Sequence, residues 1–474
     1  MLFNSLTFVV FFLVVYGAYR LLPGWGMRKN LLLASSYVFY AAWNPPFALL
    51  LLLSTVVDWW LAGRMGAETH AGRRKLWLII SLVTNLGLLS FFKYGDFLME
   101  NTKILLAAIG IDYHPPDLGI LLPVGISFYT FHTLSYTIDV YRGQLKPEAS
   151  LRDFALFVSF FPQLVAGPII RAKDFLYQLQ APPVPVPGRF TWGLFLMTLG
   201  LFQKVVIADT LLAPAADTVF GHPFPLAALD AWTGALAFGM QVFFDFSGYT
   251  LTAIGADLCF GFYLLNNFHF PYGAVGFSDF WRRWHISLSS WLRDYLYVPL
   301  GGNRFGTLRT LFNLMLVMLI GGLWHGAAWT FVVWGALHGL LLIAERGVRS
   351  LTEGAAWASR TPAQLAAWLA TIAGVTVTWV FFRSQDFGSA MKNVLSMAGF
   401  FGAQGDQILA TRDLVAVGSV VVVVLILHRA LRDSSIEAVV QRLPAWAVAA
   451  AWIVMSLSVL LTQGNGNAFI YFQF

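Results

Sequence analysis

Long runs without a charged residue alternate with short polar segments along the chain. Asp, Glu, Lys and Arg are absent from residues 30–57, 118–138, 310–344, 361–382 and 443–474. Several of these runs exceed the roughly 20 residues that a helix needs to cross the hydrocarbon core of a bilayer. The pattern therefore predicts membrane-spanning helices.

Shorter segments that are largely apolar lie between these runs, near residues 1–19, 76–92, 154–170, 190–203, 231–244 and 414–428. Together the two sets predict about eleven spans, with re-entrant and interfacial pieces. The first segment has no basic residue before it and no small-x-small cleavage site after it, so we expect it to remain in the mature protein. The expected fold class is all-α, a polytopic transmembrane helical bundle.

Composition excludes a soluble fold, because 58% of the residues are apolar and only 11% are charged, against about one quarter charged in soluble domains. No polar stretch is long enough to form a separate domain with its own core. We expect a single membrane-embedded domain over residues 1–474. The proline-rich segment 181–188 cannot be helical, and it marks only a weak division of this domain into two halves.

The net charge of +6 is spread over short loops, which argues against a nucleic-acid partner. Basic loops flanking membrane helices mark the cytoplasmic side. We expect the N-terminus outside and three loops inside, with basic residues at 20, 28 and 29, at 64, 73, 74 and 75, and at 142, 146 and 152.

Several familiar site chemistries have no sequence support. The chain contains no Gly-x-Ser-x-Gly elbow, no Gly-Lys-Ser/Thr phosphate loop, no His-Glu-x-x-His helix and only one cysteine, Cys259. A covalent Ser or Cys mechanism is therefore not expected, and neither is a metal site or a bound cofactor.

Polar groups inside apolar runs are candidates for function, because burying them in a bilayer costs free energy. His325 lies at the middle of the run 310–344, between Trp324 and Gly326, with Trp329 close by. These tryptophans can wall a cavity. The residues alone leave two interpretations open, a functional histidine or one that bonds a neighbouring helix. His338 is thirteen positions further on and falls on another face of a continuous helix. We expect it to be structural, because a lone histidine in a helical bundle usually pairs with a neighbouring helix.

Residues 277–302 combine aromatic positions at helical spacing with several arginines, which predicts an amphipathic interfacial helix. Arg282 and Arg283 could bind the phosphates of an anionic donor such as coenzyme A, or anchor lipid headgroups. His285 lies in the same segment. Asp245 and Ser247 interrupt another apolar run, where Asp245 is expected to pair with a cation more readily than to act as a catalytic acid.

The chain resembles the membrane-bound O-acyltransferase family, and within it the bacterial alginate O-acetyltransferase-like subgroup. The resemblance rests on Leu122–Phe128, Ser135–Gly143, Phe160–Pro168, Asp279–Asn303, Gly321–His338 and Phe469–Phe474. Relatives tend to continue Phe-Ser-Gly-Tyr with Ser-Asp-Met, whereas Thr250-Leu251-Thr252 follow here. A role for an acid at that place cannot be carried over.

The resemblance implies an enzyme that transfers acetyl from a cytosolic thioester, acetyl-CoA, to a hydroxyl in a tunnel through the bundle. His325 matches the family's Trp-His-Gly histidine, and His285 matches a second polar position, so the resemblance implies a catalytic base and its helper. Trp324, Arg282, Arg283, Asp245 and Ser247 are the expected substrate contacts. A periplasmic acetyltransferase partner would pass the group to an extracytoplasmic polysaccharide such as alginate, which places the chain in a bacterial inner membrane.

Two alternatives remain open. The acceptor could be peptidoglycan, cellulose, teichoic acid or a lipid. The protein could instead be a transporter in which His325 relays protons.

Overall fold

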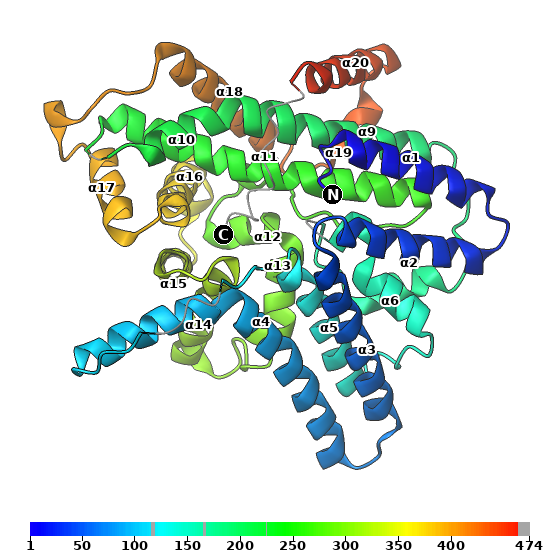
Figure 1. Ribbon diagram of the computed structural model, residues 1–474. Helices are drawn as coiled ribbons and strands as arrows, with labels where there is room; N and C mark the ends of the chain where they lie inside the picture. Colours follow the sequence, from blue (N-terminus) through cyan, green and yellow to red (C-terminus); the bar gives the residue numbers. More distant parts are fainter. Residues whose placement is uncertain (115–118, 165–166, 224, 463–474) are drawn as a thin grey trace. The chain divides into compact units, whose positions relative to one another are not determined.

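The computed structural model describes residues 1–114, 119–164, 167–223 and 225–462. This part of the chain is built of helices (Figure 1), and its only β-type pairing is an isolated bridge between Leu226 and Asp406. Eight of the described helices are long and apolar enough to cross a membrane. The expected all-α fold class is confirmed, whereas the number of about eleven spans stays a prediction.

The chain groups into two compact units. Two of the three boundaries between them fall inside helices, and the third falls in the loop after residue 260. The first unit contains residues 1–197 and 252–265. The proline-rich segment 181–188 lies within it. Its helices are α1 (Leu6–Leu21), α2 (Trp25–Ala41), α3 (Pro45–Ala67), α4 (Ala71–Ala108), α5 (Ile126–Tyr141), α6 (Leu151–Ser159), α7 (Phe161–Leu164), α8 (Ala172–Phe175), η1 (Leu176–Leu179), the start of α9 (Arg189–Leu201) and the end of α11 (Ala228–Phe260, from residue 252).

A buried polar cluster joins three helices of this first unit. Asp58 on α3 accepts hydrogen bonds from Ser81 Oγ at 2.7 Å and from Asn85 Nδ2 at 2.8 and 2.9 Å on α4. Thr133 on α5 donates to Asn85 Oδ1 at 3.0 Å. The carboxyl group of Asp58 is thus satisfied inside an apolar unit, as a polar group among membrane helices must be.

The predicted basic loops meet in this unit. Lys29 forms an ion pair with Asp153 at 2.6 Å, which joins the first loop to the third. Arg74 donates to the carbonyl oxygen of Tyr141 at 3.0 Å, which joins the second loop to the third. The three loops therefore lie on one side of the unit, as a common membrane face requires; which face is cytoplasmic stays a prediction.

The second unit contains residues 198–251 and 266–474. It holds the end of α9, η2 (Phe202–Leu212), α10 (Ala213–Gly221), α11 (Ala228–Phe260, to residue 251), η3 (Pro271–Gly273), α12 (Phe277–Arg283), α13 (Ile286–Leu292), η4 (Arg293–Tyr297), α14 (Gly306–His325), α15 (Trp329–Leu351), η5 (Ala356–Ser359), α16 (Thr361–Arg383), α17 (Phe387–Met397), η6 (Gly402–Gln404), α18 (Thr411–Ala430), α19 (Ile436–Arg442) and α20 (Ala445–Thr462). Both η2 and η4 are π-helical, a rare form that is frequent at functional sites.

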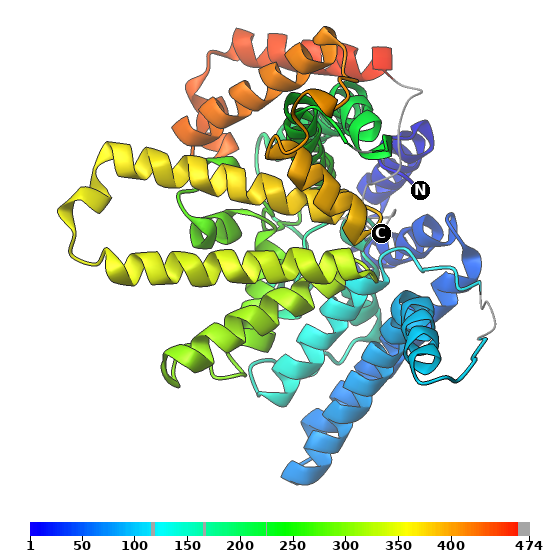
Figure 2. The same cartoon turned by 90° about the vertical axis from the view of Figure 1, so that its left-hand side faces the viewer.

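The helices α14, α15 and α16 pack in succession within the second unit (Figure 2). The backbones of α14 and α15 approach so closely that a Cβ atom on Gly322 would lie 2.3 Å from the carbonyl oxygen of Phe331. Small residues permit such contacts between membrane helices. This contact fixes the hairpin that carries His325.

Two expectations about local structure were wrong. The uncharged run 310–344 is two helices, because the backbone is extended at Gly326 and Ala328. The amphipathic helix expected in 277–302 is divided into α12 and α13 at His285, and its aromatic residues are mostly buried. The sequence match at 469–474 lies outside the described residues.

Candidate active site

His325 is the last residue of α14 and is 4% exposed. The rings of Trp324 and Trp334 have centroids 5.0 Å from that of His325, and the ring of Phe382 lies 5.3 Å away. A Cβ atom at position 326 would lie 2.1 Å from the ring of Phe331, so only glycine lets this ring close the site. Irregular backbone at membrane depth is tolerated where protein buries it, as here.

His285 approaches the same place from the junction of α12 and α13. Its φ of 43° is in the left-handed region, and its side chain is fully buried. Phe246 on α11 contacts its ring edge to face, with centroids 4.6 Å apart. Neither ring nitrogen has a hydrogen-bond partner among the described residues. Burial lowers the pKa of His285, which lies outside the eight candidate spans, so the imidazole is neutral.

The two histidines come together although 40 positions separate them in sequence. Their ring centroids are 6.3 Å apart with an interplanar angle of 62°, and Trp324 lies 5.9 Å from His285. A neutral imidazole has one nitrogen that accepts a proton and one that donates. The pair can therefore accept and donate protons within apolar walls.

His338 differs from His285 in having both nitrogens occupied. Trp281 Nε1 donates to Nδ1 of His338 at 3.3 Å, so the proton is on Nε2, which lies 2.9 Å from Thr378 Oγ1. The expected structural role has geometric support. The helical-register reasoning behind it was wrong, because no continuous helix joins residues 325 and 338.

The two tryptophans that were expected to line the site differ in burial. Trp324 is buried against both histidines. Trp329 is 61% exposed at the start of α15, so it does not line the histidine pair.

Asp245 and Ser247 are buried on α11, on either side of the Phe246 that contacts His285. As expected, Asp245 pairs with a cation: it forms an ion pair with Lys204, which also contacts Asp209 at 2.8 Å. Sequence reasoning ended the apolar segment at Gln203 and missed this buried group. The substrate contacts predicted for Asp245 and Ser247 stay predictions.

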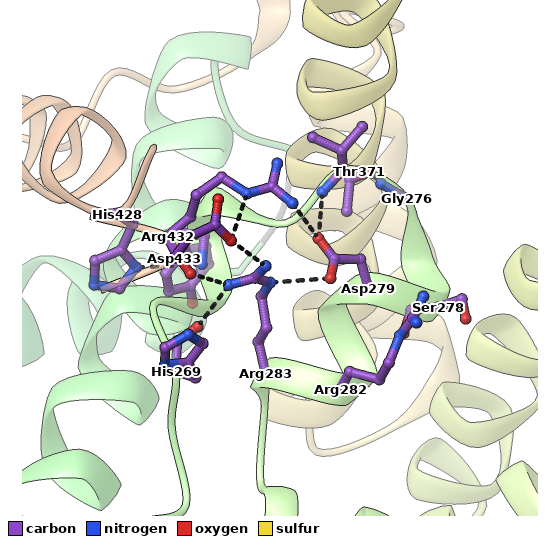
Figure 3. Close-up of polar contacts among 12 residues, drawn as sticks. His269, Gly276, Ser278, Asp279, Arg282, Arg283, Thr371, His428, Arg432 and Asp433 are labelled. Atoms are coloured by element: carbon purple, nitrogen blue, oxygen red, sulfur yellow. Dashed lines mark hydrogen bonds and ion pairs between the residues drawn. The ribbon is translucent and has the colours of Figure 1, made fainter. Parts of the chain in front are cut away.

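The structure separates Arg282 from Arg283 (Figure 3). Arg283 contacts Asp279 at 3.0 Å and Asp433 at 3.4 Å, and it also donates to the carbonyl oxygen of Arg432. Arg282 is exposed and bonds only its own helix through the carbonyl oxygen of Ser278, at 3.2 Å. Arg283 is thus held by protein groups, and the guanidinium group accessible to a donor is that of Arg282.

Among the described residues, no three or more His, Cys, Asp or Glu side chains are grouped as metal ligands would be. The site consists of imidazoles, indoles and phenyl rings, with a charged cluster beside it. This arrangement suits proton transfer in an apolar environment.

The model of the membrane-bound O-acyltransferase family matches residues 142–382. The probable alginate O-acetylase of Pseudomonas aeruginosa is 44% identical over 84% of this chain and 75% of its own length.

Two further relatives carry different names. The peptidoglycan O-acetyltransferase of Helicobacter pylori is 38% identical over 85% of this chain and 80% of its own length. The teichoic acid D-alanyltransferase of Bacillus subtilis is 29% identical over 48% of this chain and 60% of its own length. The matched region includes both His285 and His325. The chain is therefore a multi-pass O-acyltransferase of the membrane-bound O-acyltransferase family.

Proposed function

We propose that this enzyme transfers acetyl from acetyl-CoA in the cytosol toward hydroxyl groups of an extracytoplasmic polysaccharide such as alginate, through a periplasmic partner protein. The observation that carries the proposal is the buried pair of His285 and His325, with ring centroids 6.3 Å apart. Similarity to alginate and peptidoglycan O-acetyltransferases supports acetyl as the group and a polymer as the acceptor.

His325 is the general base of the proposed reaction. It takes the hydroxyl proton as the oxygen attacks the thioester carbonyl, and it returns that proton to the departing thiolate. General-base catalysis of this kind accelerates a reaction about 10²–10⁴-fold. His285, neutral and with both nitrogens available among the described residues, relays the proton or donates to the developing oxyanion.

The surrounding rings of Trp324, Trp334 and Phe382 keep water from the thioester. Exclusion of water protects a reactive acyl donor from hydrolysis. The protein would lie in a bacterial inner membrane with its N-terminus outside. The exposed Arg282 would then be on the cytosolic face, where it binds the phosphates of the donor.

The test uses purified protein in liposomes with labelled acetyl-CoA added on one side and a polysaccharide acceptor with the partner protein on the other. We expect release of CoA that depends on acceptor and label that appears on acceptor hydroxyls. Movement of intact donor or of small anions without CoA release would instead indicate a transporter. Parallel reactions with alginate, peptidoglycan, cellulose, teichoic acid and lipid acceptors identify the acceptor, and label on alginate alone is the expected result.

A further inference from the structure

Asn267 is a fully buried side chain that the proposed reaction does not use. It lies in the loop that follows α11, and it bonds the residues immediately after His285. Its carbonyl oxygen accepts from the amide of Ile286 at 2.9 Å. Its Oδ1 atom accepts from Ser287 Oγ at 2.6 Å and from the Ser287 amide at 3.3 Å. Asn267 thus fixes the main chain of the two residues that follow His285.

The same asparagine connects this bend to α11. Its Nδ2 atom donates to Thr250 Oγ1 at 3.2 Å. Thr250 lies four positions after Phe246, which contacts the ring of His285. Residues four apart share one face of a helix. This face of α11 therefore contacts the ring of His285 directly through Phe246. It also supports the backbone next to His285 indirectly, because Thr250 bonds Asn267.

His285 needs such support because its backbone is strained. His285 and Phe270 are the non-glycine residues with positive φ in the described part of the chain, at 43° and 46°. A conformation of this kind is energetically unfavourable and persists only when surrounding contacts impose it. The amide of His269 also donates to the carbonyl oxygen of Arg283 at 2.9 Å, so the bend is held on both sides.

We propose that Asn267 is a positioning residue for acyl transfer: it holds the left-handed turn at His285 and so aims that imidazole at His325. The inference rests on the proposed function of the histidine pair. Asn267 itself touches neither reacting atoms nor donor. Its effect on the reaction passes through His285.

The experiment measures acceptor-dependent CoA release by the full-length protein carrying Asn267→Ala. The matched control is Asn266→Ala, because Asn266 is the exposed neighbour whose side chain bonds, among the described residues, only the Phe268 amide, at 3.1 Å. We expect kcat to fall about 100-fold in Asn267→Ala, since a displacement of about 1 Å can cost that much. The KM for acetyl-CoA should stay within about two-fold, and the control should resemble the wild type.

A double-mutant cycle separates positioning from a general role in folding. Asn267→Ala added to His285→Ala should lower kcat by less than about three-fold, because residues that act as a unit are not additive. Thr250→Val, which removes one contact of Asn267, serves as a second variant if Asn267→Ala does not accumulate, with the same non-additivity expected. Wild-type kcat in Asn267→Ala, or effects that multiply with those of His285→Ala, would overturn the proposal. Failure of the wild-type protein to release CoA would overturn the proposed function instead.

Discussion

Gly322 provides a test of how the α14–α15 hairpin presents His325, because its substitution introduces a single methyl group at a close backbone contact of the two helices. In Gly322→Ala the new Cβ atom would lie 2.3 Å from the carbonyl oxygen of Phe331 and 3.1 Å from the backbone of Gly335. These are main-chain atoms, so no side-chain rotation relieves the overlap. The helices must move apart, three residues before His325.

The expected magnitude combines two opposing effects. Overpacking costs about 1–3 kcal/mol, and contact with rigid backbone places this variant near 3. Alanine improves helix propensity over glycine by about 1 kcal/mol. The free energy of unfolding should therefore fall by about 2 kcal/mol. Gly347→Ala on α15 is the matched control, because a Cβ atom there meets nothing within 4 Å.

The first assay is thermal unfolding of detergent-solubilised protein, in which the fraction that remains monodisperse is measured as the temperature rises. The second assay is CoA release. We expect a lower melting temperature and reduced turnover for Gly322→Ala, with neither reduced for Gly347→Ala. Equal melting temperatures for the two variants would refute the close packing of α14 on α15. Normal turnover in a destabilised Gly322→Ala would refute the dependence of the site on this hairpin.

Further variants test the charged groups. Arg282→Ala should raise the KM for acetyl-CoA several-fold without lowering the melting temperature, and an unchanged KM would favour lipid anchoring. Arg283→Ala should lower the melting temperature instead, because it leaves Asp279 without one of its cations; full stability would contradict a structural role for this network. Lys204→Met should reduce the free energy of unfolding by about 3–5 kcal/mol, since it leaves Asp245 buried without Lys204. Membrane yield and melting temperature measure this loss, and a wild-type value would show that the ion pair does not stabilise the fold.

The periodicity of apolar residues was sufficient to predict the helices and the membrane class. It failed where the main chain changes direction without a change in hydrophobicity. The break at Gly326 lies in an uncharged run, and the break at His285 lies in a segment whose aromatic residues keep helical spacing, so the side-chain pattern gave no sign of either break. The turn at His285 depends on Asn267, which is distant in sequence, and local propensity does not report such contacts.

Candidate residues were predictable to the extent that their chemistry conflicts with an apolar surrounding. His325 and Asp245 were found on this ground. Lys204 was missed because it ends an apolar run, where a lysine is expected to reach the membrane surface. Its pairing with Asp245 joins η2 to α11 and follows only from the fold.

The central claim is that His325 is the base that activates the acceptor hydroxyl. The most direct measurement compares His325→Gln with His338→Gln, another buried histidine, for acetyl transfer from labelled acetyl-CoA in liposomes at matched protein abundance. We predict that His325→Gln loses at least about 100-fold in turnover, while His338→Gln retains most of it. Acetyl transfer by His325→Gln at the rate of His338→Gln would contradict the account.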